Sequence, residues 1–110
     1  MNRIAIKPLS INDAFYGKHR KTQECRAFEE ELWYLLPAKV KIPEGKLQVH
    51  YIFGLSNRGA DVFNQEKILT DVLCKKYGWN DNRIYEGIVQ KHITKKGEEF
   101  VAFEISAWGT

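Results

Sequence analysis

The sequence predicts a single domain of the α/β class, in the α+β sense, with a mixed β-sheet packed against two main helices. Three observations favour this class. Two stretches place apolar residues at helical spacing, and several others alternate as strands do. The 110 residues suffice for one hydrophobic core but not for two. Helices and strands follow one another without a repeat or a linker, so one domain is expected over residues 1–110.

Strands are expected near the start and in the middle of the chain. Arg3–Ile6 is a plausible first strand ended by Pro8, and a polar and aromatic loop then extends to Lys21. A brief strand is expected at Lys39–Ile42. Leu47–Phe53 is the better candidate, because it alternates, with these residues on one side of the pleat: Leu47, Val49, Tyr51 and Phe53.

Two helices are expected. The first begins after Thr22, a candidate N-cap, and is stopped by Pro37. Its apolar positions are Phe28, Leu32, Leu35 and Leu36. The second helix runs from about Asn64 to Tyr77, and Gly78 is well placed to close it. Its apolar stripe consists of Ile68, Leu69, Val72 and Leu73.

The last third of the chain is predicted to form a hairpin. Ile84–Ile93 and Glu99–Ile105 have the composition of strands, and a turn through Lys96 and Gly97 joins them.

The charge balance permits an anionic partner without requiring one. Seventeen basic residues oppose fourteen acidic ones, for a net charge of +3. The basic residues gather at Lys18–Lys21 and Lys91–Lys96, as is typical of a phosphate-binding face, although solvated loops account for them equally well. On the first helix, Glu29–Glu31 are expected on a solvated face.

The remaining composition points to a reduced, cytoplasmic protein. Cys25 and Cys74 are far apart and lack metal-binding spacing, so two half-buried thiols are expected. The longest apolar run is too short to span a bilayer, so no membrane partner is expected. The sequence lacks a P-loop, a GxGxxG motif and a nucleophile elbow, so no small-molecule cofactor is expected beyond a metal.

The densest set of chemically capable side chains lies between Asp61 and Asp81. These two flank the second helix and would be roughly 20 Å apart unless the chain doubles back. On the helix, Lys67 and Asp71 share one face, with Glu66 beside them. Carboxylates here could hold Mg²⁺, and the lysine could stabilise charge on a phosphate. Surface caps and an ordinary Lys67–Asp71 ion pair are the alternative interpretation.

This region resembles the signature of the RusA family of Holliday-junction resolvases. The family shows D-x-D-N-x-x-K, a helix with D-x-L, and then G-x-x-x-D-D or a close variant. Here the matching segments are Asp61–Leu73 and Tyr77–Asp81. The stretches Pro8–Tyr16 and Lys96–Glu99 are also similar to the family, so the resemblance covers nearly the whole chain.

The resemblance implies a homodimeric endodeoxyribonuclease of DNA recombination and repair, often carried by phages. Such an enzyme binds branched DNA, above all four-way junctions, and nicks opposing strands with Mg²⁺, with Mn²⁺ as the alternative metal. Asp61 and Asp81 match its catalytic, metal-binding aspartates and Lys67 its catalytic lysine, while Asn64 matches a supporting asparagine. DNA contacts are expected from Asn12, Lys18, Arg20, Lys21, Lys91, Lys95 and Lys96.

One position departs from the family pattern. Phe63 stands where the second metal-binding aspartate belongs, and phenylalanine cannot ligate a cation. Glu66 or Asp71 would have to compensate as a metal ligand. Three functions therefore remain open: a resolvase with weakened cleavage, a catalytically inactive branched-DNA-binding module of the same fold, and a protein-interaction domain without a nucleic-acid role.

Overall fold

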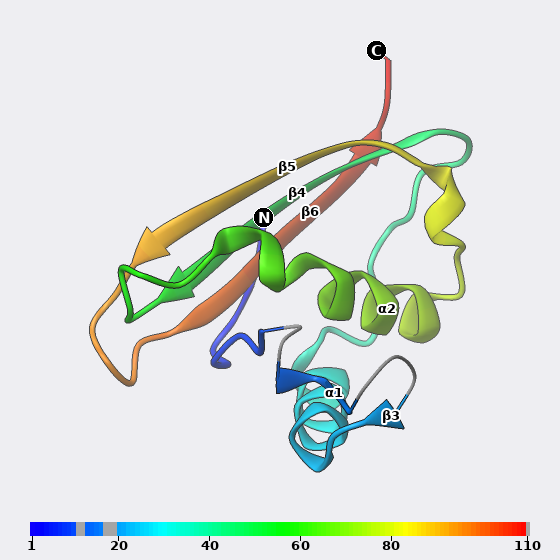
Figure 1. The fold of residues 1–110 in the computed structure, drawn as a ribbon. Helices are drawn as coiled ribbons and strands as arrows, with labels where there is room; N and C mark the ends of the chain where they lie inside the picture. Colours follow the sequence, from blue (N-terminus) through cyan, green and yellow to red (C-terminus); the bar gives the residue numbers. More distant parts are fainter. Residues whose placement is uncertain (11–12, 17–19, 110) are drawn as a thin grey trace.

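The architecture is a mixed four-stranded sheet with both helices on one of its faces (Figure 1). The computed structural model describes residues 1–10, 13–16 and 20–109. The sheet has the order β1-β6-β4-β5, and this arrangement confirms the expected fold class. Its strands are β1 (Asn2–Ile4), β4 (Leu47–Leu55), β5 (Ile84–Ile93) and β6 (Phe100–Ala107).

Strand β4 lies in the interior of the sheet, as its sequence favours. Its alternate residues Leu47, Val49, Tyr51 and Phe53 are all buried and face the helices, as predicted. It pairs in parallel with β5 and antiparallel with β6. The strand extends to Leu55, two residues beyond the predicted end.

The predicted hairpin is wrong, because β5 and β6 are not neighbours. Helix α2 (Glu66–Tyr77) carries the chain back along β4, so β5 enters beside β4 and parallel to it. The connection after β5 then passes the end of β4, where the Thr94 amide donates to the Leu55 carbonyl at 2.9 Å. The turn at Gly97 exists, with a positive φ of 92°, but it spans the width of β4 instead of joining paired strands.

Helix α1 (Gln23–Leu35) begins where expected. The Thr22 side chain accepts from the Cys25 amide at 3.1 Å, which confirms the N-cap. Phe28 and Leu32 are buried as predicted, but Leu35 is exposed. The chain leaves the helix at Leu36 in an extended conformation, so Leu36 fills the core position and Leu35 remains in solvent.

Helix α2 confirms its predicted stripe, since Ile68, Leu69, Val72 and Leu73 are buried. Gly78 closes it in the left-handed conformation, with φ 69° and ψ 44°. The helix starts two residues later than predicted because a 3₁₀ turn, η2 (Val62–Asn64), precedes it. A second 3₁₀ turn, η3 (Asp81–Arg83), leads into β5.

The first forty residues differ from the prediction in three places. Strand β1 ends at Ile4, although Ile6 is still buried. The expected loop contains a small pair of strands, β2 (Phe15–Tyr16) and β3 (Arg20–Lys21). No strand forms at Lys39–Ile42, because this segment has no neighbouring strand to pair with and is followed by Pro43; Val40 and Ile42 nevertheless pack against the core.

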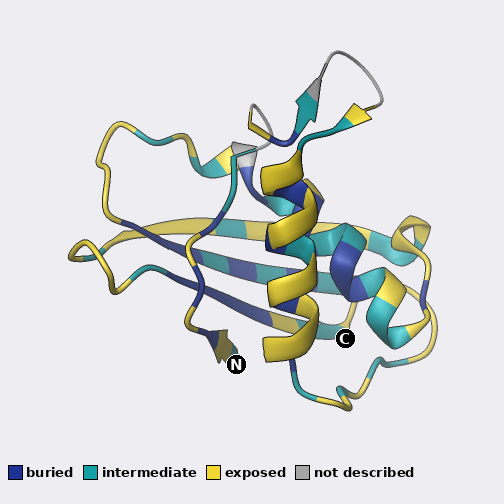
Figure 2. Ribbon diagram, turned by 90° about the horizontal axis from the view of Figure 1, so that it is seen from below, coloured by how far each residue is buried: buried dark blue, intermediate teal, exposed yellow. Residues whose placement is uncertain are grey.

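The core lies between the sheet and the two helices. Figure 2 shows α1 with an exposed outer side and a buried side turned toward the sheet. Both thiols are free, with Cys25 buried and Cys74 half-buried. On the opposite face of the sheet, His50 Nε2 lies 2.8 Å from Gln90 Oε1. In the described part of the chain, no helix is long and apolar enough to cross a membrane.

Candidate functional site

The two aspartates at the centre of the predicted site lie at opposite ends of the β4–α2–β5 unit. Asp61 follows Ala60, whose carbonyl accepts from Lys91 Nζ near the end of β5. Asp81 opens η3, directly before β5 begins. Helix α2 is about 18 Å long, and strand β5 spans about 23 Å from Ile84 to Lys91. The parallel entry of β5 therefore leaves Asp61 and Asp81 on the order of 20 Å apart within one chain.

The N-terminal end of α2 holds one half of the predicted site. Asp61 Oδ1 accepts from the Phe63 amide at 3.0 Å, so this carboxylate caps η2. Phe63 itself is 67% exposed and fills no core position. Glu66 is half-buried, and its Oε2 has no partner among the described residues. Asn64 lies in η2, and the Lys67 side chain is exposed.

The C-terminal end of α2 holds the other half. Asp71 and Asp81 line a pocket of about 400 Å³ with Cys74 and Trp79. Burial, followed by the charges of Asp81 and Asp71, raises the pKa of the Cys74 thiol to about 11. The Lys67–Asp71 ion pair of the alternative interpretation is not among the salt bridges of the described residues.

These residues do not fit a magnesium site within one chain. Asp61 and Glu66 lie at the N-terminal end of α2, Asp71 lies at its middle, and Asp81 follows its C-terminal end. Among the described residues, no three His, Cys, Asp or Glu side chains are close enough to hold a metal ion. Mg²⁺ requires oxygen ligands in a near-octahedral arrangement about 2.1 Å from the ion, so a shared metal cannot join the two halves.

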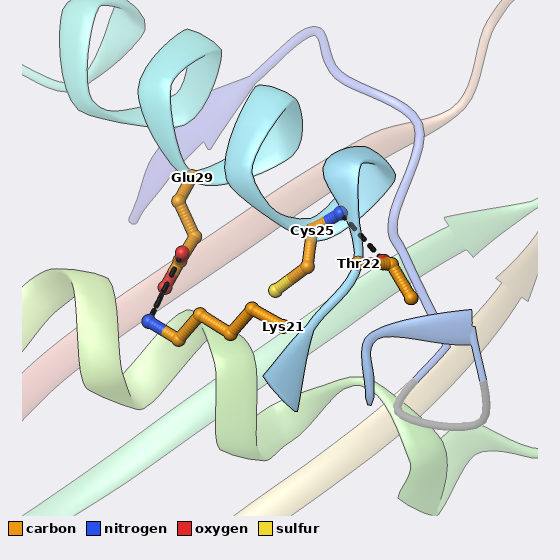
Figure 3. A network of polar contacts seen from close by, with 4 residues as sticks. All are labelled: Lys21, Thr22, Cys25 and Glu29. Carbon is orange, nitrogen blue, oxygen red and sulfur yellow. Dashed lines mark hydrogen bonds and ion pairs between the residues drawn. The ribbon is translucent and has the colours of Figure 1, made fainter. Parts of the chain in front are cut away.

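Two of the predicted DNA-binding lysines are engaged within the fold. Lys21 Nζ forms an ion pair with Glu29 Oε2 at 2.9 Å (Figure 3). The hydrogen bond to Glu29 is the main cause that raises the pKa of Lys21. The prediction that Glu29 lies on a solvated helix face is wrong, because its half-buried carboxylate pairs with Lys21. Lys91 Nζ donates to the carbonyls of Arg58 and Ala60 at 3.0 and 2.8 Å.

The other predicted DNA-binding residues are exposed or lie outside the described residues. Arg20 projects from the β2–β3 pair, and Lys95 and Lys96 lie in the connection from β5 to β6. All three are exposed, so they keep their charge available to a partner. Asn12 and Lys18 lie outside the described residues.

Asp61 opens into the largest pocket described, of about 640 Å³. Three further carboxylates line it: Asp13, Glu24 and Glu99. No sequence pattern predicts this grouping, because the four carboxylates come from four separate segments. Glu24 was predictable only as an acidic residue in the first turn of α1.

Glu99 is the best anchored of these carboxylates. Ser56 Oγ donates to its Oε2 at 2.7 Å, and the Gly97 amide donates to its Oε1 at 2.8 Å. The Ser56 hydrogen bond is the largest cause that lowers the pKa of Glu99. The Glu99 carboxylate is therefore ionised near neutral pH and held in one orientation.

Comparison with models of known protein families found no match, and no curated protein matches the chain. The resemblance to the RusA family therefore rests on the motif residues themselves.

Proposed function

We propose that this chain is a branched-DNA-binding module of the RusA type whose own carboxylates do not form a complete catalytic metal centre. The separation of Asp61 from Asp81 across the β4–α2–β5 unit carries this proposal. Phe63 supports it, because an exposed aromatic ring stands where the family has a metal-binding aspartate. The motif spacing and the net charge of +3 favour a DNA partner.

In this proposal, the phosphate contacts come chiefly from exposed basic side chains. Arg20, Lys95 and Lys96 are exposed, whereas Lys21 and Lys91 already bind protein groups. Binding governed by phosphate contacts weakens steeply as salt releases the DNA counterions. A homodimer, as the resemblance implies, would present two copies of this surface to the arms of a junction.

The test is a fluorescence-anisotropy titration of a labelled four-way junction and a matched linear duplex. Lys95→Gln/Lys96→Gln should weaken junction binding and reduce the slope of log affinity against log salt by about 2. Lys39→Gln/Lys41→Gln removes two exposed lysines outside the proposed surface and serves as the control. Equal affinity for junction and duplex would contradict a branched-DNA module.

A second candidate function, Mg²⁺-dependent junction cleavage, is favoured by one observation. Asp61 is retained and opens into a pocket with three more carboxylates. The junction is incubated with and without Mg²⁺, and with Mn²⁺, beside Asp61→Asn and Phe63→Asp. An active resolvase would produce paired nicks that require the metal, vanish in Asp61→Asn and increase in Phe63→Asp. That result would contradict the proposal of a module that only binds DNA.

A further inference from the structure

The pocket beside Asp61 has walls of two kinds. Among the residues that the structure describes, four carboxylates line it and one cation, Lys7, opposes them. Between them lie apolar surfaces contributed by Pro8, Leu9, Phe28, Leu55 and Ala60. A cavity of about 640 Å³ lies in the size range that holds small organic ligands. The net negative charge of its described walls selects against a phosphate or carboxylate ligand.

A buried amide gives an independent indication of a ligand. Gln65 also lines the pocket and is only 5% exposed. Its Oε1 atom is buried and has no hydrogen-bond partner among the described residues. Leaving such a buried acceptor unpaired is unfavourable, so a donor is expected to reach it. An N–H group on a bound molecule would satisfy this oxygen.

The spread of the carboxylates favours an extended organic cation over a metal ion. They come from the segment before β2, the first turn of α1, the segment before η2 and the segment before β6. In the described part of the chain they do not converge into a three-ligand metal cluster. A linear molecule with several ammonium groups separated by methylenes can meet separate carboxylates while its methylenes contact the apolar walls.

We propose that this pocket binds a linear aliphatic polyamine, with its ammonium groups held by the carboxylates of Asp13, Glu24, Asp61 and Glu99. The unpartnered Gln65 oxygen accepts one of its N–H groups. The inference is independent of the proposed DNA function, because it concerns an acidic cavity and not the basic surface. The same alkylammonium chemistry is available from a free polyamine and from lysine side chains, and the assignment here is to the free polyamine.

Isothermal titration calorimetry with spermidine, in the absence of DNA, tests the pocket. Saturable one-to-one binding that weakens with added salt is expected. Asp13→Asn/Glu24→Gln should weaken it roughly tenfold, since it removes two of the four proposed ion pairs. Both side chains are exposed, so these variants should fold normally. Glu31→Gln/Glu86→Gln removes two exposed carboxylates outside the pocket and should leave binding unchanged.

Further ligands distinguish the possible sources of the heat. A neutral diol of the same length should not bind, whereas binding equal to that of spermidine would overturn the proposal. Tighter binding of a blocked trilysine peptide would assign the pocket to lysine side chains and overturn the free polyamine. Mg²⁺ binding lost in the pocket variant would assign the pocket to a metal. Equal weakening of spermidine binding in Asp13→Asn/Glu24→Gln and in Glu31→Gln/Glu86→Gln would attribute the effect to the overall charge of the protein. That result would overturn the proposal.

Discussion

At the scale of single residues, Gly54 shows how tightly β4 is packed on the face away from the helices. A β-carbon at this position would overlap the ring of Phe100, its neighbour in register on β6. The Arg3 guanidinium stacks on that ring, 3.7 Å from its centroid. The ring is therefore confined from two sides and cannot easily yield.

We expect Gly54→Ala to lower the free energy of unfolding by about 1–3 kcal/mol, because overpacking forces the ring or the strand to shift. Gly87→Ala is the matched control, since its added β-carbon would lie at an ordinary 3.6 Å from Val49 Cγ2. Urea denaturation measures both variants. Equal losses in the two would show that the Phe100 ring is not the cause.

Cys74 is a residue whose ionisation the fold clearly alters. Burial and the nearby aspartates raise its pKa from 9.0 to about 11. The folded state therefore keeps the thiol proton to higher pH than the unfolded state does. As pH rises above 9, the unfolded chain ionises first, so this group's contribution to stability falls until about pH 11.

The corresponding prediction concerns alkylation of Cys74 by iodoacetamide, followed peptide by peptide in the mass spectrometer. Because the thiolate is the reacting species, the rate should rise with a midpoint near pH 11 in the folded protein. Asp81→Asn should shift that midpoint downward, whereas Asp13→Asn should not. A midpoint near 9 in the folded wild type would contradict the shift.

At the scale of elements, α1 depends on its N-cap residue, Thr22, for more than one contact. Thr22 Oγ1 accepts from the Cys25 amide at 3.1 Å and donates to the Asp13 carbonyl at 2.7 Å. The same side chain thus caps the helix and joins it to the segment that precedes β2.

Thr22→Ala should destabilise the protein by about 1–2 kcal/mol, because an amide at the helix start and the Asp13 carbonyl both lose their partner. Thr22→Ser keeps the hydroxyl and should cost less than half as much. Thermal denaturation followed by circular dichroism measures the difference. Identical losses in the two variants would assign the effect to the methyl group.

Lys91 joins β5 to the loop that carries Asp61. Its ammonium donates to the Arg58 and Ala60 carbonyls, so we expect Lys91→Met to loosen this loop. Amide hydrogen exchange at residues 57–61 should quicken several-fold in that variant. Lys95→Met removes a nearby exposed charge with no such contact and should leave this exchange unchanged.

At the scale of the whole molecule, β4 and β5 differ in how they are paired. Strand β4 bonds to neighbours on both sides, whereas β5 is an edge strand of ten residues. Nuclear magnetic resonance should therefore find slow exchange along all of β4 and rapid exchange at every second amide of β5. Uniform protection along β5 that grows with protein concentration would mean that a second copy covers this edge.

The sequence predicted the elements better than their arrangement. The Thr22 cap, the α2 stripe and the Gly78 stop are local features, and each was found where expected. The pairing of β4 with both β5 and β6 depends on contacts between distant residues, which alternation alone does not encode. A turn at Gly97 fits a hairpin and a passage around β4 equally well.

The candidate site shows the same division. Motif spacing identified Asp61 as a residue of interest, but its distance from Asp81 follows from the parallel entry of β5. The grouping of Asp61 with Asp13, Glu24 and Glu99 was out of reach, because it joins four segments that no local pattern connects. The sequence shows that Lys21 and Lys91 are basic. Only the folded structure shows that Lys21 pairs with Glu29 and that Lys91 binds the Arg58–Ala60 loop.

The position of β6 in the sheet also governs when the sheet can form during synthesis of the chain. During synthesis β1 leaves the ribosome before β6, and among the described strands β6 is the one that pairs with β1. Until Phe100–Ala107 has left the exit tunnel, β1 has no partner and one edge of β4 stays open. The nascent chain therefore cannot complete this sheet strand by strand, and the unpaired strand edges leave it prone to aggregation until β6 is in place.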